Sequence, residues 1–289
     1  DGRKLHSIFF GGGTPSLFAP DAIARIIDGV AARIDLPSDA EVTLETNPGT
    51  IEHGRFDGYR RAGVNRISFG IQSFDDAKLQ RLGRIHSAVD AEVAVREAQD
   101  AGIGNINVDL MYALPEQSEA QALHDIERAV ALQPTHVSHY QLTLEPNTPF
   151  AATPPPLPDE DSAWAMQESC QQALAEAGFA QYEVSAYSRD ARQCRHTLNY
   201  WQFGDYLGIG AGAHAKLSDA RTGSVRRRWK QRLPRSYLAA TDQASRIGGD
   251  DDVAAVDLPY EFMMNALRLN AGVPIAWFAQ RSGLALAGI

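Results

Sequence analysis

Five polar or glycine-rich segments each follow a short apolar run, and their residue types suit a site for a small polar molecule. They begin at residues 11, 45, 70, 109 and 141 and read GGGTPS, ETNPG, GIQSF, DLMYALP and QLTLEP. Three consecutive glycines leave main-chain groups uncovered, so that a ligand can approach the backbone closely. The spacing fits neither the dinucleotide-binding G-x-G-x-x-G pattern nor a P-loop, because the third glycine and the Gly-Lys-Ser/Thr sequence are absent.

Single side chains in or near these segments add hydrogen-bonding groups. Thr14 offers a hydroxyl, Glu45 can accept from an ammonium or from sugar hydroxyls, and Gln72 can both donate and accept. Arg84 could hold a carboxylate through two parallel N–H bonds. Asp109 stands between two apolar residues, so its side chain is expected to point inward, where an acid needs a partner. A ligand with an amino acid end, a ribose and a purine would use all of these groups.

The elements that would position these segments repeat along the chain. An Ala-Gly-apolar triplet at 62–64, 101–103 and 177–179 marks a helix end, a left-handed glycine and the start of a strand. Strands are expected at 5–10, 41–45, 66–72, 105–111 and 136–143, and Ser87 and Ser118 are expected to cap two helices. A further helix is expected from Glu160 to Ala177. Such repeats predict a parallel α/β sheet with helices outside it and its working face at the C-terminal strand ends.

Composition and chain breaks bound the organisation. The chain has 27 Lys and Arg against 36 Asp and Glu, a net charge of −9, which argues against a nucleic-acid binder. Cys170 and Cys194 are the only cysteines, which suits a reducing, cytoplasmic setting, and no apolar run is long enough to span a membrane. A Pro-rich stretch and an acidic stretch predict three regions, namely 1–153, 154–247 and 248–289, the last being the start of a helical domain. The opening on Asp1 and the helical pattern that breaks off at 288–289 lead us to expect a piece of a longer polypeptide.

Seven ordered segments resemble the radical S-adenosylmethionine (SAM) proteins related to oxygen-independent coproporphyrinogen III dehydrogenase, also called an oxidase, and within them the heme-chaperone branch. The segments are GGGTPS, ETNPGT, GVNRISFGIQSF, LGRIH, INVDLMYALP, YQLTLEPNT and GIGAGAH. The resemblance implies a partial TIM-like (β/α)6 radical SAM barrel with a C-terminal extension, its first strand missing. It also implies a [4Fe–4S] cluster held by a C-x-x-x-C-x-x-C motif that would precede Asp1, since two distant cysteines cannot supply that motif.

Carried over residue by residue, the resemblance implies a SAM site. Gly12, Gly13 and Thr14 would lie against the methionine end of SAM. Its polar groups and ribose would be bound by Glu45, Gln72, Arg84 and Asp109. Thr143 and His214 match positions that touch the cofactor in the dehydrogenase, although the side chains there differ.

The segment CRHTLNYW, residues 194–201, resembles the H-N-x-x-Y-W signature of the heme chaperones, with Thr197 in place of the Asn. His196 is a candidate axial ligand of heme iron, Cys194 a second one, and the rings of Tyr200 and Trp201 could cover a porphyrin face. The alternative interpretation is a packed histidine that makes a hydrogen bond. A zinc site is not expected, because Cys-x-His supplies half of a four-ligand set.

Three functions stay open at this point. The first is a heme chaperone that passes heme to receiving proteins, at the membrane surface or in the cytoplasm, as a monomer or a homodimer. The second is coproporphyrinogen III decarboxylation, and the third is a binding module without a cluster. Asn47 and Ser73 match the chaperone branch, since the dehydrogenase branch has Asp at both positions. The basic run 226–232 would meet heme propionates, an acidic partner or an anionic membrane, or form a solvated face.

Overall fold

The computed structural model describes residues 2–49, 54–219 and 221–285. Within it the chain forms two compact units, residues 1–196 and 197–289. Asp1 and residues 286–289, on which the expectation of a longer polypeptide was based, lie outside the described residues.

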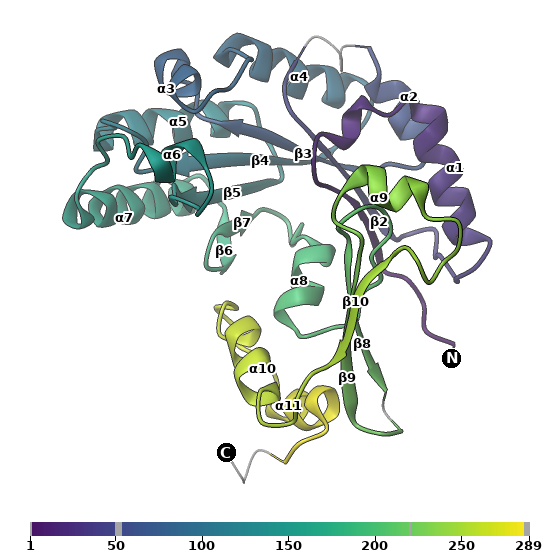
Figure 1. The fold of residues 1–289 in the computed structure, drawn as a ribbon. Helices are drawn as coiled ribbons and strands as arrows, with labels where there is room; N and C mark the ends of the chain where they lie inside the picture. The colour runs from purple at the N-terminus through teal and green to yellow at the C-terminus, as the bar shows by residue number, and fades with distance from the viewer. Residues whose placement is uncertain (1, 50–53, 220, 286–289) are drawn as a thin grey trace. The chain divides into compact units, whose positions relative to one another are not determined.

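The first unit is built on a seven-stranded sheet with the strand order β1-β2-β3-β4-β5-β7-β6. The strands are β1 (Ser7–Phe10), β2 (Glu41–Thr46), β3 (Arg66–Gln72), β4 (Asn105–Tyr112), β5 (His136–Gln141), β6 (Ala180–Glu183) and β7 (Ala186–Ser188). The first five are parallel and pair in chain order, which confirms the predicted α/β barrel repeats. The sheet curls into an open half-barrel (Figure 1).

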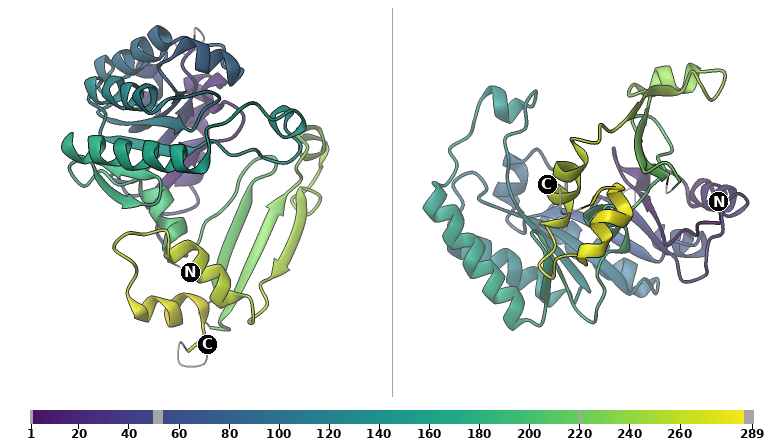
Figure 2. Two further views of the ribbon diagram at one scale, coloured as in Figure 1. Left: turned by 90° about the vertical axis from the view of Figure 1, so that its left-hand side faces the viewer. Right: turned by 90° about the horizontal axis from the view of Figure 1, so that it is seen from below.

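Helices cover the outer face of this sheet, as the views in Figure 2 show. They are α1 (Pro20–Ala31), α2 (Phe56–Arg61), α3 (Asp76–Arg81), α4 (Ala88–Asp100), α5 (Glu119–Ala131) and α7 (Glu160–Glu176). The short elements η1 (Pro15–Leu17) and α6 (Pro149–Ala152) follow β1 and β5. Ser87 and Ser118 form the expected caps, each as a reciprocal capping box that satisfies free N–H groups of the first turn.

The two faces of the sheet differ in polarity because side chains alternate along each strand. The outer face is apolar and packs under the helices, with Leu44, Ile67, Val108 and Val137 fully buried. The inner face is polar, and its residues include Glu41, Thr43, Arg66, Ser68, Asn107, Asp109, His136 and Ser138. Such a polar face cannot pack as a second apolar core, so its buried groups need polar partners.

One strand near the last edge of the sheet, β7, was not predicted from the repeats. As expected, Gly178 takes a positive φ of 84° after α7, and β6 begins at Ala180. However, β7 turns back and pairs antiparallel with both β5 and β6, so it separates the two. Val184 lies in the two-residue turn between β6 and β7 and is 46% exposed.

The second unit contains an antiparallel sheet with the order β10-β9-β8. Its strands are β8 (His214–Asp219), β9 (Ser224–Lys230) and β10 (Ile247–Asp252), and its helices are α9 (Pro234–Ala239), α10 (Leu258–Ala266) and α11 (Ile275–Ser282). Helix α8 (Arg195–Trp201) begins at the end of the first unit. Phe203, Val225, Leu258, Phe262 and Phe278 form the core of this unit. No helix among the described residues is long and apolar enough to cross a membrane.

Candidate functional site

The glycine turn after β1 is closed on one side and open on the other. A Cβ on Gly11 would stand 2.7 Å from a ring carbon of Phe9 and 3.0 Å from Oε2 of Glu45. By contrast, a Cβ on Gly12 or Gly13 would meet no atom within 4 Å. Gly12 has a φ of 110°, and its N–H donates to Oε2 of Glu45 at 3.1 Å. Gly11 is therefore required by packing, while Gly12 and Gly13 expose bare backbone to a ligand.

Asn47 joins the ends of the first strands. Its side-chain N–H donates to Oγ1 of Thr14 at 3.0 Å, and its carbonyl accepts from Nη1 of Arg84 at 3.2 Å. A Cβ on Gly70 would stand 2.9 Å from that carbonyl oxygen, so a larger residue there would displace the Asn47 side chain. The sequence singled out Asn47 only as a mark of one branch, whereas the structure makes it the connection between Thr14 and Arg84.

Gln72 ends β3 in a left-handed conformation with a φ of 77°, at an irregularity in the β3–β4 register. Its Oε1 accepts from the hydroxyl of Tyr140 at 3.0 Å. Burial raises the pKa of Tyr140, helped by nearby Asp109, so the phenol stays protonated and able to donate. A non-glycine residue at positive φ is uncommon, which makes this strand end a candidate for function.

Two carboxyl groups lie near the turn, and burial raises the pKa of both. For Glu45 the bond from the Gly12 N–H lowers the pKa in part, and the charge of Asp109 raises it further. Asp109 accepts from Asn107 at 2.8 Å and from Ser68 at 3.1 Å, and these bonds offset part of its burial. A bound ammonium or sugar hydroxyl would stabilise the charged form of such carboxylates.

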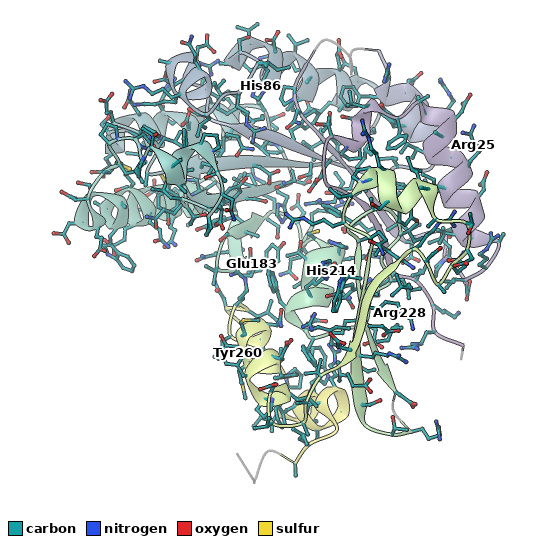
Figure 3. The ribbon with its side chains drawn as sticks, in the orientation of Figure 1. Arg25, His86, Glu183, His214, Arg228 and Tyr260 are labelled. Carbon is teal, nitrogen blue, oxygen red and sulfur yellow. The ribbon has the colours of Figure 1, made fainter. Side chains whose placement is uncertain are left out.

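The structure gathers seven of the nine predicted SAM contacts in the first unit, around the C-terminal ends of β1–β4. These seven are Gly12, Gly13, Thr14, Glu45, Gln72, Arg84 and Asp109. Thr143 follows β5, is exposed, and donates to Oε1 of Glu145 at 2.8 Å. His214 begins β8 in the second unit, where its exposed ring stacks on Trp229 with centroids 6.1 Å apart (Figure 3).

A buried hydrogen-bond chain crosses the inner face below these strand ends. Nδ1 of His136 contacts Oδ1 of Asn107 at 2.6 Å, and Nε2 contacts the hydroxyl of Tyr182 at 2.7 Å. Burial holds the pKa of His136 well below its usual value, so the ring is neutral. Since the Asn107 oxygen can only accept, Nδ1 carries the proton and Tyr182 donates to Nε2. The sequence analysis did not predict this hydrogen-bond chain. Polar residues at every second position of β4 and β5 could have indicated a polar face of the sheet there.

The start of α8 is fastened to the inner face by Glu41. Its two carboxylate oxygens accept from the backbone N–H of Arg195 at 3.1 Å, from that of His196 at 3.2 Å, and from the Cys194 thiol at 3.5 Å. A carboxylate at a helix N-terminus satisfies free N–H groups and complements the helix dipole. Cys194 is 2% exposed.

The four predicted heme residues have protein contacts of their own. The ring of His196 stacks on Phe9 with centroids 4.2 Å apart, and burial lowers its pKa to about 4. Tyr200 packs against Tyr206 with centroids 4.4 Å apart, and Trp201 lies under the guanidinium of Arg268 at 4.2 Å. His196, Tyr200 and Trp201 all lie on α8, which Cys194 directly precedes.

Three arginines of the basic run, all on β9, form ion pairs within their own unit. Arg226 and Arg228 both bond to Asp250 on β10, and Arg227 bonds to Glu261 on α10. Arg228 is labelled in Figure 3. These ion pairs weaken the expectation that the run as a whole attracts an anionic membrane or heme propionates.

One buried acid was not anticipated. Asp125 on α5 is 3% exposed, and it accepts from the Ser73 hydroxyl at 2.8 Å and from the backbone N–H of Phe74 at 2.6 Å. Burial raises its pKa to about 6. Ser73 thus positions the chain that leaves β3.

Comparison with known proteins gives two family matches, the Radical SAM superfamily over residues 1–129 and the HemN C-terminal domain over residues 253–289. The chain is 49% identical over 287 residues to the heme chaperone HemW of Haemophilus influenzae, covering 99% of this chain and 74% of that protein. It is also 49% identical over 283 residues to HemW of Escherichia coli, covering 98% of this chain and 74% of that protein.

Among solved structures, the fold is similar to that of the radical SAM enzyme coproporphyrinogen III oxidase (HemN) from Escherichia coli. The TM-score is 0.80 at 21% identity, over 99% of this chain and 68% of the other. This similarity confirms the predicted radical SAM fold.

Proposed function

Since this chain belongs to the HemW family of radical SAM proteins, we propose that it is a heme chaperone that binds heme and passes it to receiving proteins. The observation that carries the proposal is the 49% identity to HemW over 99% of the chain. The local structure around Asn47 supports the same branch. Its amide both donates to Thr14 and accepts from Arg84, whereas the Asp of the dehydrogenase branch could only accept.

We propose SAM as the cofactor of the first unit, because the residues around the glycine turn fit its groups. The open sides of Gly12 and Gly13 leave room for a chain that lies against the backbone. Glu45 would accept from the methionine ammonium, and Arg84 would donate to the carboxylate. Gln72 and Asp109 would bind the ribose hydroxyls, with Gln72 held by Tyr140. When bound, SAM supplies a sulfonium whose carbon–sulfur bonds are activated for cleavage.

The residues present do not fit an iron–sulfur cluster. The chain has two cysteines, Cys170 and Cys194, and both are buried. Within residues 2–49, 54–219 and 221–285, no three His, Cys, Asp or Glu side chains are grouped to hold a metal ion. A cluster needs more cysteine ligands than this chain carries, so no step of the proposal passes through one.

His196 is the proposed iron ligand of the heme cargo. With a pKa of about 4 its imidazole is neutral at physiological pH, and neutral imidazole is the form that ligates iron. The stacking on Phe9 covers a face of the ring, whereas an iron ligand uses a nitrogen lone pair in the ring plane. Tyr200 and Trp201 are proposed to contact the porphyrin. Cys194 is the weaker ligand, because its thiol is buried and donates to Glu41.

The proposed recipients are heme proteins, in the cytoplasm or at the membrane surface. The pairing of Arg226 and Arg228 with Asp250 makes a broad electrostatic attachment to anionic lipid less favourable than the basic run alone would suggest.

Titration with hemin followed by Soret absorbance tests the function. We expect saturable binding that weakens in His196→Ala and in His196→Phe, the second of which keeps a ring against Phe9. His124→Ala, at an exposed position on α5, is the matched control and should bind as the unaltered protein does. Unchanged spectra and affinity in both His196 variants would remove His196 as ligand. Absence of saturable hemin binding would contradict the chaperone assignment.

A further inference from the structure

Arg66 is a buried cation that forms no ion pair among the described residues. It lies on the inner face of β3, is 2% exposed, and its Nε has no hydrogen-bond partner. Among the residues that the structure describes, none forms a hydrogen bond or an ion pair with its guanidinium. An unpaired buried charge costs several kcal/mol, so proteins rarely keep one without a use.

Thr43 adds a second unpartnered group at the same place. It is Arg66's Cα partner in the parallel β2–β3 register, so the two side chains share the inner face. Thr43 is fully buried, and its Oγ1 also lacks a hydrogen-bond partner among the described residues. Two adjacent buried hydrogen-bond donors therefore lack an acceptor among the described residues. This indicates that the acceptor belongs to another molecule that binds here.

Two acids on the same face, Asp109 and Glu41, already accept hydrogen bonds from other groups. Both oxygens of Asp109 accept bonds, from Asn107 and from Ser68, although Arg66 lowers the pKa of Asp109 through its charge. Both oxygens of Glu41 accept from the start of α8. Neither acid forms an ion pair with Arg66 among the described residues.

The neighbouring histidines cannot neutralise Arg66 either. Burial and the charge of Arg66 lower the pKa of His136 and of His196, so that both rings are neutral. These pKa shifts also place the guanidinium near His196, on the inner face to which α8 is fastened. An anion bound at this position would contact the Arg66 guanidinium and the Thr43 hydroxyl, among the polar side chains of the inner face.

We propose that Arg66 and Thr43 form a receptor for one carboxylate group on the inner face of the half-barrel. The guanidinium donates two N–H bonds to the carboxylate, and the Thr43 hydroxyl donates a third. The carboxylate belongs to a propionate of heme, and this assignment rests on the proposed function, whereas the receptor for a carboxylate does not. A small free carboxylate is the other source of the same chemistry.

Two porphyrin probes test the propionate assignment. Iron deuteroporphyrin IX and its dimethyl ester differ only in the two carboxylates, and their affinities are compared by Soret titration. We expect the diacid to bind roughly tenfold or more tightly than the ester, as a charge-assisted bidentate pair predicts. This preference should disappear in Arg66→Met and fall in Thr43→Val, but persist in Arg25→Met, which removes an exposed arginine of α1 (Figure 3).

A stability measurement separates this role from a structural one. If Arg66 only held the fold together, Arg66→Met would lower the melting temperature. Since the native charge is unpaired, the proposal predicts an equal or higher melting temperature for Arg66→Met without ligand. A lower one would overturn the premise.

The remaining outcomes decide between ligand sources. An equal acid-to-ester ratio in the unaltered protein and in Arg66→Met overturns the propionate assignment. If no porphyrin binds at all, the proposed function fails, and malonate tests the receptor on its own. Stabilisation by malonate that requires Arg66 then supports a small-carboxylate site. Absence of any Arg66-dependent effect of porphyrin or malonate means that water alone solvates Arg66, and the proposal is wrong.

Discussion

The glycine turn offers a matched pair of substitutions that separates packing from ligand binding. Gly11→Ala places a methyl group 2.7 Å from the Phe9 ring and 3.0 Å from Glu45. The Phe9 ring stacks on His196 and cannot simply swing away. Overpacking of this kind costs about 1–3 kcal/mol, so Gly11→Ala should lower the free energy of unfolding by that amount. Glu45 should also lose its bond from the Gly12 N–H.

Gly13→Ala makes the same chemical change two residues later, where a Cβ meets nothing within 4 Å and φ is not positive. Its free energy of unfolding should therefore stay within about 0.5 kcal/mol of the unaltered protein. If SAM lies against this backbone, the methyl group occupies its place. We expect about a tenfold or greater loss of SAM affinity, roughly 1.4 kcal/mol.

Urea unfolding gives the stability of both variants, and isothermal titration calorimetry gives their affinity for SAM. The reasoning is refuted if Gly13→Ala binds SAM as tightly as the unaltered protein. It is also refuted if Gly13→Ala destabilises the fold as much as Gly11→Ala, because a methyl group at residue 13 would then not fit into free space.

Two further predictions concern buried acids. The folded-state pKa of Asp125 is raised from 3.8 to about 6, so its protonated form favours the folded protein. That stabilisation is complete below about pH 4 and is lost as the pH rises to about 6. Relative to Asp125→Asn, the free energy of unfolding of the unaltered protein, measured in urea, should fall by about 3 kcal/mol across this window. The same pH dependence of the free energy of unfolding in both proteins would contradict the prediction for Asp125. Glu41→Ala should destabilise the start of α8 by about 1–2 kcal/mol and speed amide exchange at Arg195 and His196, because their N–H groups lose their acceptor. Unchanged exchange would show that Glu41 does not cap the helix.

The sequence was most informative where backbone geometry is local. Gly63, Gly102 and Gly178 all take the positive φ that a helix end before a strand requires. The capping boxes at Ser87 and Ser118 depend on residues three positions apart and were equally legible. These features repeat along the chain, and their repetition is what predicted the parallel strands of the half-barrel.

Features that depend on distant residues were less accessible. Asn47 bonds to side chains 33 and 37 residues away, so its joining role needs the tertiary fold. Asp125 stands in an amphipathic helix, where an acid ordinarily faces solvent, and its hydrogen-bond donor Ser73 lies 52 residues earlier in the chain. The β6–β7 turn lacks glycine and proline, so the sequence did not indicate that the chain reverses its direction at Val184.

Amide chemical-shift mapping with SAM tests the proposed cofactor site most directly. Glycine amides resolve well, and the protein offers reporters at the turn, on β3 and on the outer surface. SAM should shift the amide resonances of Gly12, Gly13 and Gly70, and leave that of Gly178, which follows α7, in place. Shifts at Gly178 without shifts at the turn would contradict the assignment of this strand-end site to SAM.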